Sequence, residues 1–123
     1  MKILLVDDEK INALSASRLL EKHGYKVVVA SNGQEALDRL DESDFDCILM
    51  DIQMPEMDGY EAIERIRDEF VFGEKSKTPI IAMTGHCYSD AYKEFKQAGI
   101  RHYICKPFDF NNLLEVIKVA TED

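Results

Sequence analysis

The chain has 123 residues, of which 24 are acidic and 15 are basic, so its formal net charge at pH 7 is −9. This charge repels a polyanion such as DNA or RNA, which argues against direct nucleic-acid binding. The length suits one domain, and a content of 46% hydrophobic and 32% charged residues is that of an ordinary folded protein. We therefore expect a single domain over residues 1–123, with no second domain on this chain.

Neither a membrane span nor an export signal is expected. The longest segment without Asp, Glu, Lys or Arg is residues 78–89, which is too short to cross about 30 Å of hydrocarbon. The apolar run near the N-terminus ends at Asp7, before it reaches signal-peptide length. Cys47, Cys87 and Cys105 show no metal-ligand spacing, and their odd number favours a reducing compartment. These features predict a cytoplasmic protein whose cysteines are unpaired.

Short apolar runs alternate along the chain with longer segments of helical spacing, a pattern typical of a parallel sheet with helices on both faces. The five expected strands are Ile3–Val6, Lys26–Ala30, Cys47–Met50, Pro79–Met83 and His102–Cys105. Most of them lack polar alternation, which predicts that both of their faces are covered. The alternation predicts an α/β fold of (βα)5 type.

The segments between and after the strands carry helical patterns. The first helix is expected over roughly Lys10–His23, and residues 72–78 are expected to form a loop. The expected core positions are Ala16, Leu19, Leu20 and His23 in the first helix, then Ala36, Leu37 and Leu40, then Ile63, Ile66 and Phe70, then Tyr88, Ala91, Tyr92 and Phe95, and finally Phe110, Leu113, Leu114 and Ile117. The expected helix ends are Gly24 and Gly99, and the expected helix starts are Asp58, Ser89 and Asp109.

Polar side chains follow four of the five strands. Asp7 and Asp8 follow the first strand, Asp51 the third, Thr84 the fourth and Lys106 the fifth. Ligands of doubly wound sheets bind at these carboxyl ends, so we expect the five side chains to converge. Carboxylates 4 Å apart repel by about 4 kcal/mol per pair at an effective dielectric constant of 20, so folding alone does not explain the cluster. A divalent cation does, and oxygen ligands suit Mg²⁺, with Mn²⁺ or Ca²⁺ as substitutes.

The same group of side chains also suits phosphoryl transfer. A metal ion, the Lys106 ammonium and the Thr84 hydroxyl can disperse charge over transferring oxygens, and a carboxylate can accept phosphate covalently. Each of these residues taken alone is more often structural, because acids at strand ends frequently cap the next helix. It is the combination, in this order along the chain, that points to phosphate chemistry.

Four segments carry a resemblance to a known family: residues 3–9 (ILLVDDE), 51–59 (DIQMPEMDG), 79–85 (PIIAMTG) and 106–108 (KPF). Together they resemble the receiver domain of response regulators in two-component signalling, over essentially the whole chain. The resemblance implies a flavodoxin-like, doubly wound sheet with strand order 2-1-3-4-5. It also implies Mg²⁺-dependent transfer of phosphate from a histidine kinase or a phosphotransfer protein to one aspartate, which then alters binding to a downstream protein target. The resemblance fits both a single-domain regulator and a receiver that belongs to a hybrid kinase or a larger regulator.

The resemblance assigns the acceptor and the metal ligands. Asp51 corresponds to the phosphoacceptor. Asp8, Asp51 and the backbone carbonyl of Gln53 would hold Mg²⁺, and Asp7 would help directly or through water. Gln53 is also one of two positions that tune the phosphate lifetime in this family, and His86 is the other.

Further roles follow from the same resemblance. Thr84 would hydrogen-bond the phosphoryl group, and Lys106 would form an ion pair with it. Tyr103 matches the family's aromatic switch, and the peptide bond before Pro107 is expected to be cis. The surface expected to change on phosphorylation joins residues 88–95 to the last strand and last helix. Its candidate docking aromatics are Tyr88, Tyr92, Tyr103, Phe108 and Phe110.

Three other functions remain to be weighed against the receiver. A haloacid-dehalogenase-like phosphatase, the Mg²⁺-dependent aspartyl-phosphate alternative, needs an Asp-x-Asp pair and a cap, whereas residues 51–53 read Asp-Ile-Gln. A flavin or dinucleotide module needs a phosphate-binding loop, and no GxGxxG follows the first strand. A scaffold that is never phosphorylated would not need the complete set of acids, threonine and lysine.

Overall fold

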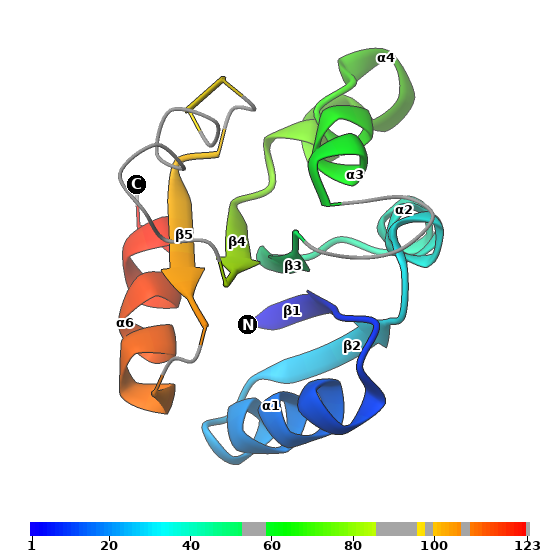
Figure 1. The fold of residues 1–123 in the computed structure, drawn as a ribbon. Coiled ribbons are helices and arrows are strands. Elements are labelled where there is room, and N and C mark those ends of the chain that lie inside the picture. The colour runs from blue at the N-terminus through cyan, green and yellow to red at the C-terminus, as the bar shows by residue number, and fades with distance from the viewer. Residues whose placement is uncertain (53–58, 86–95, 98–99, 107–108, 123) are drawn as a thin grey trace.

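A five-stranded parallel sheet forms the centre of the computed structural model, which describes residues 1–52, 59–85, 96–97, 100–106 and 109–122. The strands are β1 (Lys2–Val6), β2 (Lys26–Ala30), β3 (Cys47–Asp51), β4 (Ile80–Thr84) and β5 (His102–Cys105). Their order is β2-β1-β3-β4-β5, and every neighbouring pair is parallel (Figure 1). The predicted α/β fold and strand order are therefore confirmed.

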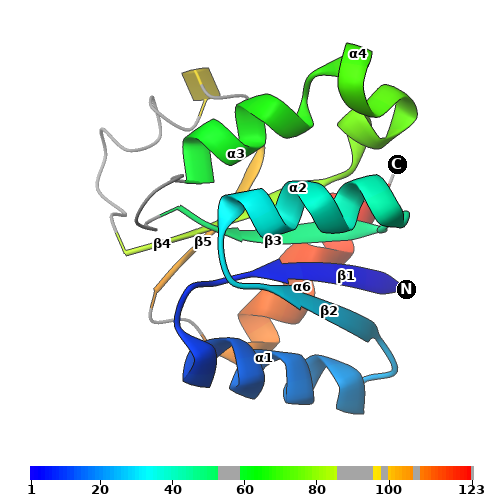
Figure 2. The same ribbon diagram turned by 90° about the vertical axis from the view of Figure 1, so that its right-hand side faces the viewer.

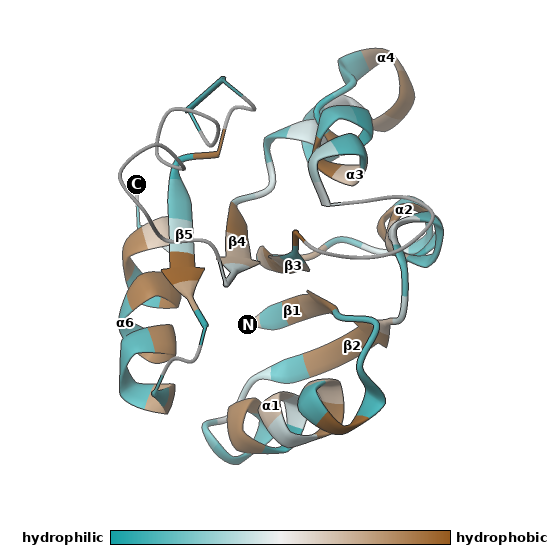
Figure 3. Ribbon diagram, in the orientation of Figure 1, coloured by the Kyte–Doolittle hydropathy of each residue, from teal (hydrophilic) through white to brown (hydrophobic). Residues whose placement is uncertain are grey.

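Helices cover both faces of this sheet (Figure 2). α1 (Lys10–Lys22) and α6 (Phe110–Thr121) pack on one face, whereas α2 (Gly33–Glu42) and α3 (Gly59–Ile66) pack on the other. Every residue of β3 and β4 is buried, because helices lie on both sides of the central strands. Figure 3 shows the resulting apolar character of the central strands. The expectation that most strands are covered on both faces is confirmed.

Two strands extend one residue beyond their predicted ends. β3 ends at Asp51 and β4 ends at Thr84, so both residues belong to the parallel ladder. Asp51 is in register with Met83, and Thr84 is in register with Cys105. The backbone hydrogen bonds of the sheet consequently fix the Cα positions of both polar residues.

The buried face of α1 differs from the predicted one. Its buried residues are Ala13, Ser17 and Leu20, which lie on one helical stripe. Leu19 is 40% exposed, so its predicted place in the core is wrong. His23 is also exposed, and its ring contacts the ring of Phe110 with a centroid distance of 4.9 Å. The predicted and the buried faces of α1 share Leu20 but are rotated relative to each other about the helix axis.

The predicted core position of Phe70 is also wrong. α3 ends at Ile66, and the side chain of Asp68 accepts a hydrogen bond from the amide of Phe70 at 3.0 Å, which begins a new short helix, α4 (Glu69–Phe72). Because α4 is a separate helix, the apolar spacing of α3 does not continue to Phe70, and the side chain of Phe70 is fully exposed. The expected loop that follows is instead a 3-10 helix, η1 (Gly73–Lys77).

Local signals mark several helix ends as expected. Gly24 follows α1 with φ +89°, a conformation that favours glycine. The side chain of Asp109 accepts a 2.7 Å hydrogen bond from the amide of Asn112 at the start of α6. Asp58, Ser89 and Gly99 lie outside the described residues, as do the predicted core positions between 88 and 95.

The cysteines do not all behave as predicted. Cys47 is free and buried, whereas Cys105 is disulfide-bonded. The expectation of unpaired cysteines is therefore wrong for Cys105, because pairing depends on distances in space that spacing along the chain does not reveal. Cys87 lies outside the described residues. Among the helices that the structure describes, none is long and apolar enough to cross a bilayer.

Candidate functional site

Three carboxylates meet at the carboxyl edge of β1 and β3. Asp7 and Asp8 directly follow β1, Asp51 ends β3, and these two strands are parallel neighbours with Val6 opposite Met50. One carboxylate oxygen from each aspartate lies within 4.8 Å of the other two. The predicted convergence of the acidic side chains is confirmed.

The three aspartates differ in exposure. Asp7 is 5% exposed and Asp51 is 3% exposed, whereas Asp8 lies open to solvent. Asp7 is held in place, because its carboxylate accepts a hydrogen bond from the amide of Glu9 at 2.9 Å and its own amide donates to Ala30 O at 3.1 Å. Two carboxylates are thus fixed in the protein, and the third borders the solvent from which a cation would enter.

Lys106 supplies a positive charge beside the cluster. Its Nζ lies 3.3 Å from Oδ1 of Asp51, and its side chain is 30% exposed. One ammonium offsets one of three carboxylate charges, so the cluster keeps an excess of negative charge. This donor set of carboxylate oxygens fits a small divalent cation.

Thr84 and Lys106 are joined through the backbone. The amide of Lys106 donates to the carbonyl oxygen of Thr84 at 2.7 Å, which extends the β4–β5 pairing by one step. Thr84 is 1% exposed and lies one residue beyond the pair of Asp51 with Met83. All five polar residues predicted to converge therefore lie at the carboxyl edge of neighbouring strands.

Close packing against the end of β3 accounts for the glycine at position 59, the last residue of the Asp51–Gly59 motif. A Cβ at Gly59 would lie 2.6 Å from the carbonyl oxygen of Asp51 and 2.6 Å from the Cα of Ile52. The Gly59 amide also donates to the carbonyl oxygen of Ile52 at 3.0 Å. α3 can begin against the end of β3 only because this residue has no side chain.

The other residues predicted from the sequence are less fully described. Tyr103 lies in β5 opposite Ala82, and it is 38% exposed. Phe110 is partly buried against the core on the α1–α6 face. The remaining site residues predicted, which lie outside the described residues, are Gln53, His86, Tyr88, Tyr92, Pro107 and Phe108.

A cavity of about 300 Å³ beside the cluster was not anticipated from the sequence. α1 and α6 line it, with Leu19 on one side and Phe110 on the other, and it reaches Asp7 and Lys106. Leu19, which was predicted to lie in the core, thus lines an opening next to the carboxylates.

A comparison with protein-family models identifies the family of this chain. The model of the response regulator receiver domain matches residues 3–118. The chain belongs to this family. It is a receiver domain of a two-component system, and its fold is the one expected for that family.

Solved receiver domains share the fold over nearly their whole length. Chemotaxis protein CheY4 of Vibrio cholerae is 32% identical, with a TM-score of 0.88 and coverage of 97% of both chains. The receiver domain of sensor histidine kinase PA1611 from Pseudomonas aeruginosa is 31% identical, with a TM-score of 0.86 and coverage of 98% of this chain and 96% of that one. The PA1611 structure holds a magnesium ion in its active-site cleft.

Curated relatives include much longer sensor kinases. Sensor protein GacS of Pseudomonas syringae is 36% identical over 94% of this chain, and hybrid signal transduction histidine kinase I of Dictyostelium discoideum is 39% identical over 94%. The chain spans 13% and 7% of the length of these two relatives. It is therefore similar to the receiver domains of hybrid kinases.

The contact at Gly59 predicts that Gly59→Ala disturbs the carboxylate cluster. Because the added methyl would overlap the backbone at Asp51, we expect the free energy of unfolding in urea to fall by about 1–3 kcal/mol. We also expect weaker Mg²⁺ binding in isothermal titration calorimetry, because the displaced backbone carries Asp51.

Gly24→Ala is the matched control. A Cβ at Gly24 meets nothing within 4 Å, and this position loses stability through its positive φ alone. Its Mg²⁺ affinity should equal that of the wild type. A Gly59→Ala protein with wild-type stability and Mg²⁺ affinity would contradict the close contact.

Proposed function

We propose that this receiver accepts a phosphoryl group from a phosphohistidine onto Asp51. The observation that carries the proposal is the meeting of three carboxylates and the Lys106 ammonium at the end of β3. The acceptor is nearly buried, yet it lies beside Asp8, which faces solvent. A donor can therefore approach from the carboxyl edge of the sheet.

Asp7, Asp8 and Asp51 would hold Mg²⁺ together with the backbone carbonyl of Gln53. The fit rests on the chemistry of the donors, since carboxylate and carbonyl oxygens suit this ion, and Mn²⁺ or Ca²⁺ would occupy the same donors as substitutes. The bound ion would offset the negative charge on the oxygens of the phosphoryl group during transfer. The PA1611 receiver, which contains magnesium in its cleft, supports this assignment.

In the transfer step, a carboxylate oxygen of Asp51 forms a bond to phosphorus as the bond from phosphorus to the donor's imidazole nitrogen breaks. The products are an acyl phosphate and a neutral histidine. Lys106, which now pairs with Asp51, would turn to the phosphoryl oxygens, and the Thr84 hydroxyl would donate a hydrogen bond to one of them. Both residues stabilise the same charge from the β4 and β5 sides.

Phosphorylation would be transmitted to a partner through β5. A phosphoryl group adds close to two negative charges and three strong acceptors, so it draws Thr84 and Lys106 inward. Tyr103, partly exposed in this structure, would turn into the space that Thr84 leaves. The surface around Tyr103 and α6 would then bind a downstream protein target. Gln53 and His86 would set how quickly water removes the phosphate.

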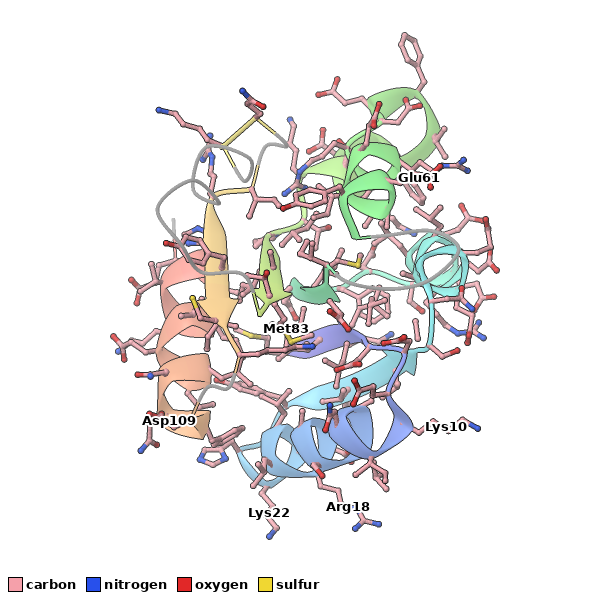
Figure 4. The ribbon with its side chains drawn as sticks, in the orientation of Figure 1. Lys10, Arg18, Lys22, Glu61, Met83 and Asp109 are labelled. Carbon is pink, nitrogen blue, oxygen red and sulfur yellow. The ribbon has the colours of Figure 1, made fainter. Side chains whose placement is uncertain are left out.

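The donor would be a histidine kinase or a histidine phosphotransfer protein that docks on α1. Ile11 is 80% exposed and Leu14 is 51% exposed on this helix, although both are apolar. Figure 4 shows Lys10, Arg18 and Lys22 pointing away from the sheet on the same helix. An apolar surface with a basic rim next to the cavity at Asp7 suits the helical surface of a phosphodonor.

The assignment of the acceptor predicts covalent labelling of Asp51. The wild type incubated with Mg²⁺ and acetyl phosphate should gain the mass of one phosphoryl group by intact mass spectrometry, and Asp51→Asn should gain none. Lys106→Met should label at least about tenfold more slowly, because the ammonium no longer neutralises the phosphoryl oxygens.

Undiminished labelling of Asp51→Asn would refute the acceptor assignment. Continuous hydrolysis of phosphorylated small molecules at enzyme-like rates would instead favour the aspartyl-phosphate phosphatase alternative. Loss of labelling when Mg²⁺ is removed with a chelator, and its return with Mn²⁺, would separate the metal requirement from the acceptor.

Docking of the phosphodonor on α1 predicts that a substitution on this helix slows transfer from a protein donor but not from a small-molecule donor. Ile11→Glu should slow transfer from a phosphorylated histidine phosphotransfer protein by about tenfold, because it places a charge in an apolar contact. The same variant should label with acetyl phosphate at the wild-type rate, since the carboxylate cluster is untouched. Phe70→Glu is the matched control, as Phe70 is exposed on α4, across the sheet from α1 (Figure 2). Equal slowing by both variants would contradict docking on α1.

A further inference from the structure

A groove lies between α2 and α4. Its apolar walls are Leu37 on α2 and the pair Val71 and Phe72 on α4, and its volume is about 510 Å³. This volume falls in the range of about 300–1,000 Å³ that binding sites occupy. α2, α3 and α4 lie on the face of the sheet opposite α1 and α6 (Figure 2). The groove is therefore separate from the helix on which the phosphodonor is proposed to dock.

The apolar part of the groove is open to solvent. Leu37 is buried and Phe72 is partly buried, and both pack in the core of this face. Val71 is 64% exposed, although it is apolar. A wall that is so open does not enclose a small molecule, whereas an apolar side chain of a partner protein would remove it from water. The groove consequently suits a protein surface.

Acidic side chains line the groove on both sides. Asp38 and Asp41 belong to α2, and Asp68 directly precedes α4. All three are exposed, and within the described part of the chain no Lys or Arg side chain forms an ion pair with them. Arg65 also lines the groove, but its guanidinium pairs with Glu61 at 3.2 Å. The groove thus presents negative charge that a cationic partner would neutralise.

The α2 side of the groove has the geometry of a helical stripe. The lining residues of α2 are spaced three or four positions apart, which places them along one side of the helix: Gln34, Leu37, Asp38 and Asp41. From Gln34 to Asp41 this stripe covers about two turns, or about 10 Å at 1.5 Å per residue. A partner helix that lies along it can contact the groove with side chains at the same spacing.

We infer that the groove between α2 and α4 binds a basic amphipathic helix of a partner protein other than the phosphodonor. Apolar side chains of that helix contact Leu37 and Val71, and its Lys or Arg side chains pair with Asp38 and Asp41. The complementarity rests on the apolar walls and the unpaired carboxylates alone. The inference therefore does not depend on which residue accepts the phosphoryl group.

A second copy of this chain is a less suitable occupant. Each copy carries a net charge of −9, so two copies repel each other. α1 offers exposed Ile11 and Leu14, but a contact of α1 with the groove of the next copy joins two different surfaces and builds open chains. Sedimentation velocity should therefore find a monomer. Self-association that Val71→Ser abolishes would overturn the inference and assign the groove to a second copy.

A model peptide tests the inference. The probe is a fluorescent peptide of leucine and lysine in helical spacing, about four turns long, and its binding to the protein is followed by fluorescence anisotropy at about 0.15 M salt. Val71→Ser should weaken binding at least about fivefold, because it removes an apolar contact. Asp38→Asn combined with Asp41→Asn should weaken it by a similar factor, because the lysines lose two partners. All three positions are exposed, so circular dichroism should show an unchanged fold.

The matched control removes two negative charges from the opposite face of the sheet. Glu21→Gln combined with Glu115→Gln changes exposed residues of α1 and α6, and it should bind the peptide with wild-type affinity. In NMR spectra the peptide should shift the amide signals of α2 and α4. Equal weakening by both double variants, or shifts centred on α1, would overturn the inference and leave only non-specific attraction of a cationic peptide. Equally tight binding of a peptide with serine in place of leucine would overturn it as well.

Discussion

Repulsion among like charges is the constraint on which the rest of this structure depends. β1 and β3 are parallel neighbours, so the residues at their carboxyl ends must share a small space. Here those residues are Asp7, Asp8 and Asp51, with carboxylate oxygens within 4.8 Å of one another. The Lys106 ammonium offsets part of the repulsion, and the remaining negative charge is what makes the cluster suited to a divalent cation.

The surrounding fold holds this arrangement in place and connects it to the far side of the sheet. The ladder fixes the backbone of Asp51 against Met83, and Gly59 lets α3 begin in contact with Asp51. From there the connection runs to Thr84 at the end of β4, and through one hydrogen bond to Lys106. A charge placed on Asp51 would thus affect β5, which lies two strands away from β3 in the sheet.

The parts of this structure that could be predicted were those encoded in short stretches of sequence. Buried strands appear as apolar runs, and the residues that follow them were predicted to converge because parallel strands end at one edge. Phe70 was wrongly assigned to the core, because a new N-cap at Asp68 starts a separate helix. Leu19 was wrongly assigned to it, because the buried stripe of α1 runs through Ala13, Ser17 and Leu20. The disulfide at Cys105 was missed because it depends on distances in space.

The free energy of unfolding with and without Mg²⁺ tests the central claim most directly. At matched ionic strength, Mg²⁺ should stabilise the wild type in urea denaturation, because only the folded chain gathers the three carboxylates. Without Mg²⁺, Asp8→Asn should be more stable than the wild type by about 1 kcal/mol, since it removes a repelling charge. With Mg²⁺ this order should reverse. A wild type that is indifferent to Mg²⁺, or an Asp8→Asn variant that is less stable without it, would contradict the account.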